Sequence, residues 1–182
     1  KINGVAYANI NTFMTLTLPS QVVNDRGVFG GGDSPSNVLD YITIATTGNA
    51  TDFGDLTVAR YTVGACSSST RGIFGGGTIA VAVSNVVDYI TIATPGNATD
   101  FGDLTVKRES LTACSNATRG VFGGGFYNDG ESQFFYTTMD YITITTAGNA
   151  TNFGGLTVGR RFLAACSSST RGVFGGGIIG PV

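Results

Sequence analysis

Apolar and polar residues alternate over short stretches of this chain, and glycine or asparagine separates one stretch from the next. The segment DYITIAT at 40–46 places Tyr and Ile between polar residues, and it returns at 88–94 and, as DYITITT, at 140–146. Such alternation over about 4–8 residues, rich in β-branched and aromatic side chains, is typical of a β-strand with one buried face. No stretch carries a helical period, so the pattern predicts an all-β protein.

The strand pattern belongs to a tandem repeat. Segments of 38 residues at 40–77, 88–125 and 140–177 align without a gap, and a divergent first unit covers 1–32. Each segment contains four strand signals: DYITIAT, then FGDLTV or FGGLTV after a Gly-Asn turn, then a small apolar stretch such as LTACS, then RGVFGGG or RGIFGGG. Four short strands per unit, with a period in the forties, predict the blades of a β-propeller.

Counted from its arginine, each unit resembles a kelch repeat. RYTVGACSSSTRGIFGGGTIAVAVSNVVDYITIATPGNATDFGDLTVKR has a leading Arg, a small-residue inner strand, an apolar strand ending in paired glycines, a Tyr in the third strand and a large aromatic in the fourth. The units depart from the kelch pattern at Phe53, Phe101 and Phe153, where kelch repeats usually carry Trp. The resemblance covers nearly the whole chain and implies a kelch-like β-propeller fold, but no activity.

We expect one β-propeller domain over 1–182. If strands are lettered a to d outward from the axis, the chain begins with an irregular c and d pair, NGVAYANI and FMTLTLP, runs a to d three times, and finishes with a and b at 161–177. The two ends then complete one blade, which predicts a closed ring of four blades of four antiparallel strands without exposed edges. A segment of a larger ring is the alternative, because kelch rings more often have five to seven blades.

The glycine run has a second interpretation. RGVFGGG or RGIFGGG occurs at 26–32, 71–77, 119–125 and 171–177, and a glycine run after an apolar strand can bind phosphate through backbone N–H groups. A phosphate loop needs a following helix N-terminus and usually a Lys, whereas each copy here leads into a loop and then a β-strand. We therefore predict that the glycines mark places where blades pack too closely for side chains, with the adjacent Phe between the sheets.

The units differ most in the segment that follows the glycines. It spans 7 residues at 33–39, 10 at 78–87 and 14 at 126–139, while the framework admits no insertion, which is typical of a loop. It joins strand b to strand c, and the variable d-to-a connection would lie on the same face of the ring. The longest copy, FYNDGESQFFYTTM, predicts a ligand or partner surface together with two arginines of the neighbouring connection. The predicted residues are Phe126, Tyr127, Asp129, Glu131, Phe134, Phe135, Tyr136, Arg160 and Arg161.

Aromatic side chains rimmed with polar groups suit a glycan or a protein surface. The same loop could instead pack its aromatics on its own body or line a subunit contact, and a homo-oligomer stays open. The Gly-, Ser- and Thr-rich units with an NATDFGDLTV core are similar to repeats in structural proteins of marine bacteriophages, particularly those of cyanobacteria. That resemblance implies a virion or extracellular protein, such as a tail fibre or decoration protein, whose partner is a host-surface glycan or protein or another virion subunit.

Composition argues against several classes of function. With 10 basic and 12 acidic residues and no histidine, the chain has neither an electrostatic footprint for nucleic acid nor a Ser-His or Cys-His pair. No apolar run approaches the roughly 20 residues that span a bilayer, so we expect no membrane insertion. We expect a non-catalytic protein, because only Asp129 and Glu131 could serve as a glycosidase carboxylate pair.

No cofactor and no metal are expected. Cys66, Cys114 and Cys166 occupy equivalent positions in separate repeats, which predicts buried free thiols, and a three-thiolate metal ring would lack any support from histidine or a CxxC pair. The carboxylates of NATDFGD could hold calcium, yet the third copy has Asn152 and Gly155 in their place.

Other repeated polar residues predict a structural role. Each of the four NAT triplets is a glycosylation sequon, but three lie in the Gly-Asn turn, where Asn is favoured by its backbone geometry. Arginines and aspartates at fixed framework positions predict ion pairs or backbone hydrogen bonds that hold the blades together. These residues are Arg26, Arg71, Arg119 and Arg171, and Asp40, Asp88 and Asp140.

Overall fold

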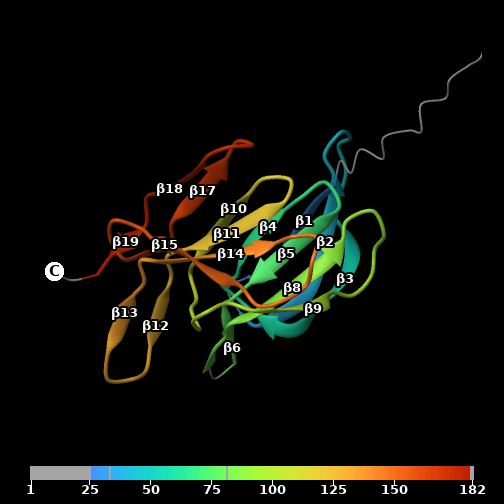
Figure 1. The fold of residues 1–182 in the computed structure, drawn as a ribbon. Coiled ribbons are helices and arrows are strands. Elements are labelled where there is room, and N and C mark those ends of the chain that lie inside the picture. The colour runs from blue at the N-terminus through green and yellow to red at the C-terminus, as the bar shows by residue number, and fades with distance from the viewer. Residues whose placement is uncertain (1–25, 33, 81, 181–182) are drawn as a thin grey trace, which may run out of the picture.

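A computed structural model describes residues 26–32, 34–80 and 82–180, and this part of the chain is all-β, as the alternating pattern predicts (Figure 1). The first sheet is antiparallel and has the order β1-β2-β3. Its strands are β1 (Arg26–Gly30), β2 (Ser36–Thr43) and β3 (Thr51–Arg60). The c and d strands expected before β1, at NGVAYANI and FMTLTLP, lie outside the described residues.

Two complete four-stranded sheets follow, and each is an antiparallel meander. Each combines the last two strand signals of one 38-residue segment with the first two of the next segment. The second sheet consists of β4 (Gly64–Ser67), β5 (Arg71–Gly75), β8 (Val86–Thr91) and β9 (Thr99–Asp103). The third consists of β10 (Thr112–Ser115), β11 (Arg119–Gly123), β14 (Thr138–Thr143) and β15 (Thr151–Gly155). A last hairpin pairs β17 (Ala164–Ser167) with β18 (Gly172–Gly175).

The variable b-to-c segments form short hairpins. Those of the second and third sheets are β6 (Thr78–Ile79) with β7 (Ala82–Val83), and β12 (Phe126–Asn128) with β13 (Gln133–Phe135). Farther along, β16 (Arg160–Arg161) pairs with β19 (Ile178–Ile179). Bridges between Tyr61 and Thr78 and between Glu109 and Phe126 join the preceding d-to-a connection to each hairpin. The two variable connections therefore lie side by side.

Successive sheets meet along their first strands, which lie in a row in the order β4, β10, β17 (Figure 1). Serine hydroxyls join these strands: Ser115 Oγ donates to Ser67 O at 2.7 Å, and Ser167 Oγ donates to Ser115 O at 2.7 Å. Each Oγ also accepts a hydrogen bond from the backbone N–H of the same serine in the preceding sheet. Ser67 N donates to Ser115 Oγ at 3.2 Å, and Ser115 N donates to Ser167 Oγ at 3.3 Å. The SSS and SNA segments thus place one hydrogen-bonding side chain at each contact between sheets.

The glycines of RGVFGGG pack as predicted. A Cβ placed on Gly75 would lie 2.8 Å from the ring of Phe122 in the next sheet, and one on Gly123 would lie 2.8 Å from the ring of Phe174. A side chain at Gly75 would collide with the fully buried ring of Phe122, which has no space to move in a close-packed interior, and one at Gly123 would collide with the half-buried ring of Phe174. The recurrent glycines are therefore required by the contact between sheets.

Buried ion pairs also join the sheets, but not with the arginines that we expected. Arg60 Nη2 lies 2.5 Å from Asp88 Oδ2, and Arg108 Nη2 lies 3.0 Å from Asp140 Oδ2, with all four side chains fully buried. Arg60 is the last residue of β3, Arg108 lies in the connection between β9 and β10, and each aspartate lies on the third strand of the next sheet. The prediction that Asp88 and Asp140 hold the blades together through ion pairs is thus confirmed, but their partners are Arg60 and Arg108.

Two of the four arginines that begin RGVFGGG or RGIFGGG make backbone hydrogen bonds to the next sheet instead, whereas Arg119 and Arg171 are exposed. Arg26 Nη1 donates to Ile92 O at 2.8 Å, and Arg71 Nη1 donates to Ile144 O at 2.9 Å. Their guanidinium groups also lie over tyrosine rings of their own sheets, with Arg71 Cζ 4.4 Å from the Tyr89 ring centroid. These contacts confirm the predicted role in holding neighbouring sheets together.

The Gly-Asn turns dock on the preceding sheet as well. Asn97 Oδ1 accepts Asp55 N at 3.1 Å, and Asn149 Oδ1 accepts Asp103 N at 3.1 Å. At this contact Gly102 has φ of +136°, and a Cβ there would lie 2.6 Å from the backbone of Gly148. The side-chain amide oxygen of each of these asparagines therefore joins two sheets, a role that the sequence did not predict.

The two ends of the array lack the neighbour that every internal sheet has. Phe53 and Phe101 on the outer strands of the first two sheets are 2% exposed, whereas Phe153 at the same position of the third sheet is 47% exposed. At the other end Phe29 is 58% exposed, although its equivalent Phe74 is buried. The described residues therefore form an open array.

The prediction of three buried thiols is confirmed for Cys114 only, because Cys66 is half-buried and Cys166 is exposed. Cys66 Sγ and Cys114 Sγ lie against Gly120 and Gly172 of the next sheet, at 2.7 and 2.6 Å from a Cβ built there. Burial, with a smaller contribution from Cys114, raises the pKa of the Cys66 thiol to about 12. Cys166 is exposed because no described residue forms the next sheet against it.

Candidate binding surface

The hairpin β12–β13 carries the aromatic residues in two layers. Phe126 pairs with Phe135 and Tyr127 pairs with Phe134 in the antiparallel register. Because successive side chains of a strand point to opposite faces, the two pairs lie on opposite sides of the hairpin. Phe126 and Phe135 meet edge to face with centroids 5.1 Å apart, and Tyr127 and Phe134 are stacked with centroids 6.1 Å apart.

Arg161 lies on the inner layer of this hairpin. Its Cζ is 4.2 Å from the Phe126 centroid, 5.5 Å from that of Phe135 and 5.3 Å from that of Phe162. Phe126 is buried, so the cation is held against ring faces that are partly shielded from water, where the attraction is larger than at an exposed site. Arg161 therefore fixes the hairpin to the neighbouring connection.

Small residues let the hairpin approach the body of the protein. A Cβ at Gly159 would overlap the carbonyl oxygen of Phe135, and a Cβ at Gly180 would lie 2.8 Å from the Phe135 ring. The equivalents of Gly159 in the earlier units are Ala59 and Lys107. Glycine thus stands at this position only in the third unit, whose long hairpin packs against it. This difference between the units is a sequence signal for the contact.

The outer layer is accessible. Phe134 is 43% exposed, and its partner Tyr127 is half-buried. Phe162, which the sequence did not single out, is 57% exposed and has φ of +55°, like Thr62 and Ser110 at the same position of the other connections. Replacement of these polar residues by an exposed aromatic is the signal that could have identified Phe162.

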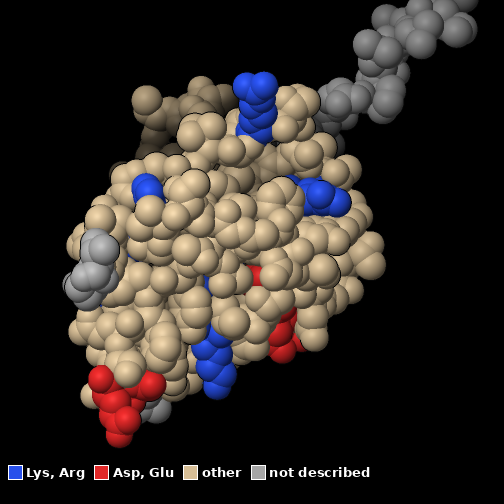
Figure 2. Space-filling model, turned by 60° about the vertical axis from the view of Figure 1, so that its left-hand side comes forward, with Lys and Arg blue, Asp and Glu red and all other residues tan. Residues whose placement is uncertain are grey.

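Two acidic residues lie at the tip of the hairpin. Asp129 Oδ1 accepts the backbone N–H groups of Ser132 at 2.6 Å and Glu131 at 2.9 Å. These hydrogen bonds lower the pKa of Asp129, so its carboxylate stays ionised and shapes the turn. Glu131 is exposed beside it. Charged side chains are sparse on the face that Figure 2 shows, and uncharged residues make up most of it.

Tyr136 and Arg160 lie closer to the framework. Tyr136 N donates to Gly125 O at 2.9 Å, and burial raises the pKa of the half-buried Tyr136 hydroxyl, with Arg108 opposing the shift. Arg160 Nη1 donates to Gly176 O at 3.2 Å, as Arg60 donates to Gly76 O at 2.9 Å. Arg160 thus has the place of the arginines that pair with an aspartate of the next sheet. Of the two adjacent arginines, Arg161 is the one that joins the aromatic group.

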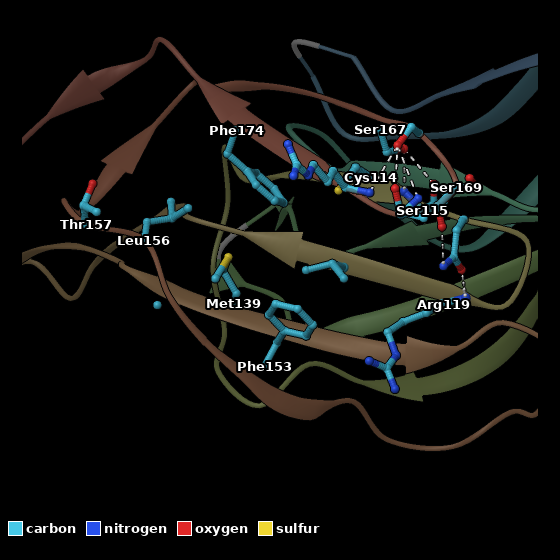
Figure 3. A pocket seen from close by; sticks show the side chains of 17 residues that line it. Cys114, Ser115, Arg119, Met139, Phe153, Leu156, Thr157, Ser167, Ser169 and Phe174 are labelled. Atoms are coloured by element: carbon cyan, nitrogen blue, oxygen red, sulfur yellow. Dashed lines mark hydrogen bonds between the residues drawn. The ribbon is translucent and has the colours of Figure 1, made fainter.

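A second feature is a cleft of about 510 Å³ between the third sheet and the last hairpin (Figure 3). Phe153, Met139 and Leu156 line one side of it, and Phe174 and the Ser167–Gly172 segment line the other. In the complete part of the array the equivalent residues Phe101 and Leu104 are buried in a core cluster with Ile142 and Ile144 of the next sheet. The cleft is thus the uncovered side of the third sheet, with apolar side chains such as Phe153 and Met139 on one wall and mainly polar residues on the other.

In the described part of the chain, no three His, Cys, Asp or Glu side chains come together in a group that could hold a metal ion. The same residues include no helix with the length and apolar character that a bilayer crossing needs. No protein-family model matches the chain, and a search of curated proteins found no match.

Proposed function

We propose that the protein is a non-catalytic binding module whose variable face contacts a surface ligand through the hairpin β12–β13. The observation that carries the proposal is the outer aromatic layer, in which Tyr127 stacks on an exposed Phe134. The two shorter b-to-c segments have no comparable pair. A variable segment that is shaped by Arg161 and Gly159 on a repeated framework is the usual arrangement of a binding loop.

A glycan or protein on a host surface fits this site. A flat, accessible aromatic pair offers stacking area with little conformational entropy to lose, and the acidic residues at the tip can accept hydrogen bonds. The similarity of the repeats to those of marine bacteriophage structural proteins supports a place in a virion, such as a tail fibre or decoration protein. In the alternative, the same face docks another virion subunit.

The framework of this module is proposed to be a kelch-like β-propeller. The meandering four-stranded sheets, joined by their first strands, support blades of that type. Closure into four blades stays a prediction, because it requires residues 1–18 to supply the outer strands of the last blade. Removal of residues 1–18 tests it: closure predicts a large loss of stability, and an unchanged unfolding midpoint would contradict it.

Binding is tested with purified protein and outer-membrane vesicles from a panel of marine cyanobacteria. Tyr127→Ser with Phe134→Ser should reduce retention on vesicles at least tenfold and leave the far-UV circular dichroism unchanged, because both side chains are on the outer layer. The matched control is Ile79→Ser on the shorter hairpin β6–β7, which should bind like the wild type.

Two results would count against the proposal. Equal retention of the double variant and the wild type would show that the aromatic pair makes no contact. Failure of the wild type on every vesicle, together with specific capture of purified virion subunits through the same hairpin, would support the subunit-docking alternative.

A further inference from the structure

Contacts between successive sheets draw on three pairings, and all three occur between the second and third sheets. In the first, a Phe of the second strand covers a Gly of the preceding sheet. Phe74 lies 3.3 Å from a Cβ built on Gly30, and Phe122 lies 2.8 Å from one on Gly75. We call this set of pairings the joint.

The second pairing places a cysteine of one sheet on a glycine of the next, as Cys66 on Gly120 and Cys114 on Gly172. In the third pairing, the arginine that begins the second strand of one sheet donates to a main-chain carbonyl of the next sheet, as Arg71 does to Ile144 O at 2.9 Å. A complete joint therefore needs a glycine, a cysteine and an arginine on one sheet. These meet, in the same order, a phenylalanine ring, a glycine and a main-chain carbonyl on the next sheet.

The two ends of the array hold the unmatched halves of one such joint. On the last hairpin, a Cβ at Gly175 would have no atom within 4 Å, and both Cys166 and Arg171 are exposed. On the first sheet, Phe29 is 58% exposed and Ile44 is 68% exposed. Gly27 of the first sheet also lacks a partner cysteine. The three atoms nearest to a Cβ built there belong to Phe29, Ile42 and Ile44 of its own unit.

We propose that the protein docks head to tail on a second copy of itself, with the last hairpin of one copy on the first sheet of the other. Phe29 then fills the space at Gly175, Cys166 lies on Gly27, and Arg171 donates to Ile44 O. This proposal goes beyond the binding function and does not depend on it. It is the alternative to closure of four blades within one chain, because the last hairpin and the first sheet can make only one of the two contacts.

A second copy fits better than the chain's own first sheet. Equivalent joints repeat one rotation, so in a closed ring of four the last hairpin would already cover the first sheet after the third joint. Instead the hairpin and β1 lie at opposite ends of the row, with β10 and β4 between them (Figure 1). A head-to-tail contact that does not close within one chain builds larger rings or open filaments of copies.

Charge supports the same pairing. From residue 153 to residue 180 the only charged side chains are Arg160, Arg161 and Arg171. The first sheet exposes Asp40 and Asp52. The basic end of one copy would therefore approach an acidic end of the other, which favours head-to-tail over end-to-identical-end contact.

The test is a disulfide between Gly27→Cys and the native Cys166. The joint places a Cβ at the glycine 2.6–2.7 Å from the partner Sγ, as at Gly172 and Gly120, which is within reach of a disulfide bond. A Cβ at Gly27 has no neighbour closer than 3.5 Å, so the variant should fold. Equal amounts of ¹⁵N-labelled and unlabelled protein are mixed, oxidised with a mild catalyst and digested with trypsin.

We expect a linked peptide of fragments 27–60 and 162–171 that carries mixed isotope labels, and its loss in Gly27→Cys with Cys166→Ser. A linked peptide that is never mixed would overturn the proposal, because the joint would then close within one chain. No link at all would also overturn it, provided that the positive control Gly120→Cys forms its disulfide with Cys66.

Sedimentation provides a second measurement without new thiols. The wild type should show a mass above 18.7 kDa that rises with concentration. Phe29→Ser should weaken the association about 10- to 100-fold, as expected for loss of one buried aromatic side chain. The matched control Phe134→Ser should leave it unchanged. Equal association of Phe29→Ser and the wild type would contradict the proposed contact.

Discussion

Removal of Asp88 should destabilise the protein far more than removal of Asp40, its equivalent in the first sheet. Asp88 is fully buried and accepts hydrogen bonds from Arg60 Nη2 at 2.5 Å and Thr57 Oγ1 at 2.6 Å. Burial lowers the pKa of Arg60 while Asp88 raises it, and without this carboxylate a charged guanidinium would be left unpaired in the interior. Breaking one side of such a pair costs about 3–5 kcal/mol.

Asp40 is exposed and is in no salt bridge with a described residue. We expect Asp40→Ala to change the free energy of unfolding by less than about 0.5 kcal/mol. The assay is urea unfolding followed by circular dichroism. Total stability is on the order of 5–15 kcal/mol for a domain, so Asp88→Ala could fail to fold. The double variant Arg60→Met with Asp88→Leu should then recover a cooperative transition, because an apolar pair leaves no buried charge.

Two results would refute this account of the joint. A loss below about 1 kcal/mol in Asp88→Ala would mean that the pair contributes no net stability. An equal loss in Asp40→Ala, measured at low protein concentration, would mean that the first sheet has a covering neighbour within its own chain.

Two further predictions concern the uncovered third sheet and the thiols. Phe101→Ala should cost about 3–5 kcal/mol of unfolding free energy, whereas Phe153→Ala should cost less than about 1 kcal/mol because its ring is already half exposed; equal losses in urea unfolding would contradict the open array. A thiol reagent at pH 8 should label Cys166 rapidly and Cys66 slowly, since the pKa of Cys66 is raised to about 12. Mass spectrometry of tryptic peptides measures the labelling, and rapid labelling of Cys66 in the native protein would contradict the prediction. Because 12 lies above the ordinary value of 9.0, the stability that this thiol contributes is present below about pH 9 and is lost as pH rises toward 12, so the unfolding midpoint should fall over that range less steeply in Cys66→Ala.

The sequence predicts the sheets well because their signals are local. Alternation of Tyr, Ile and Thr in DYITIAT has the period of a strand, and the Gly-Asn turn ends it, so the four strands of each unit follow from neighbouring residues alone. The glycine and Phe of RGVFGGG predict close packing for the same reason, and the rings of Phe122 and Phe174 confirm it.

The sequence does not predict which residues meet across sheets. Arg60, Arg108 and Arg160 are equivalent in sequence, but only the first two have a described aspartate beside them. Cys166 is exposed for the same reason, although its sequence context matches that of Cys66. In both cases the environment depends on the neighbouring sheet and on the rotation of each joint, and a repeat pattern contains neither.

The candidate surface is predicted in part. The length and aromatic content of 126–139 locate the hairpin, but the division into two layers follows from the register, which pairs Phe126 with Phe135 and Tyr127 with Phe134. Phe162 was missed because it stands in a short connection without any periodic pattern. Its backbone conformation brings its ring beside Arg161.

The most direct test of the proposed function is amide hydrogen exchange with and without the vesicles that retain the protein. The variable face and the Gly-Asn turns lie on opposite ends of the strands, so protection reports which face binds. We predict slower exchange at 127–136 on binding, with no change at the turns 45–50, 93–98 and 145–150. Protection at the turns, with the hairpin exchanging as in the free protein, would contradict the account.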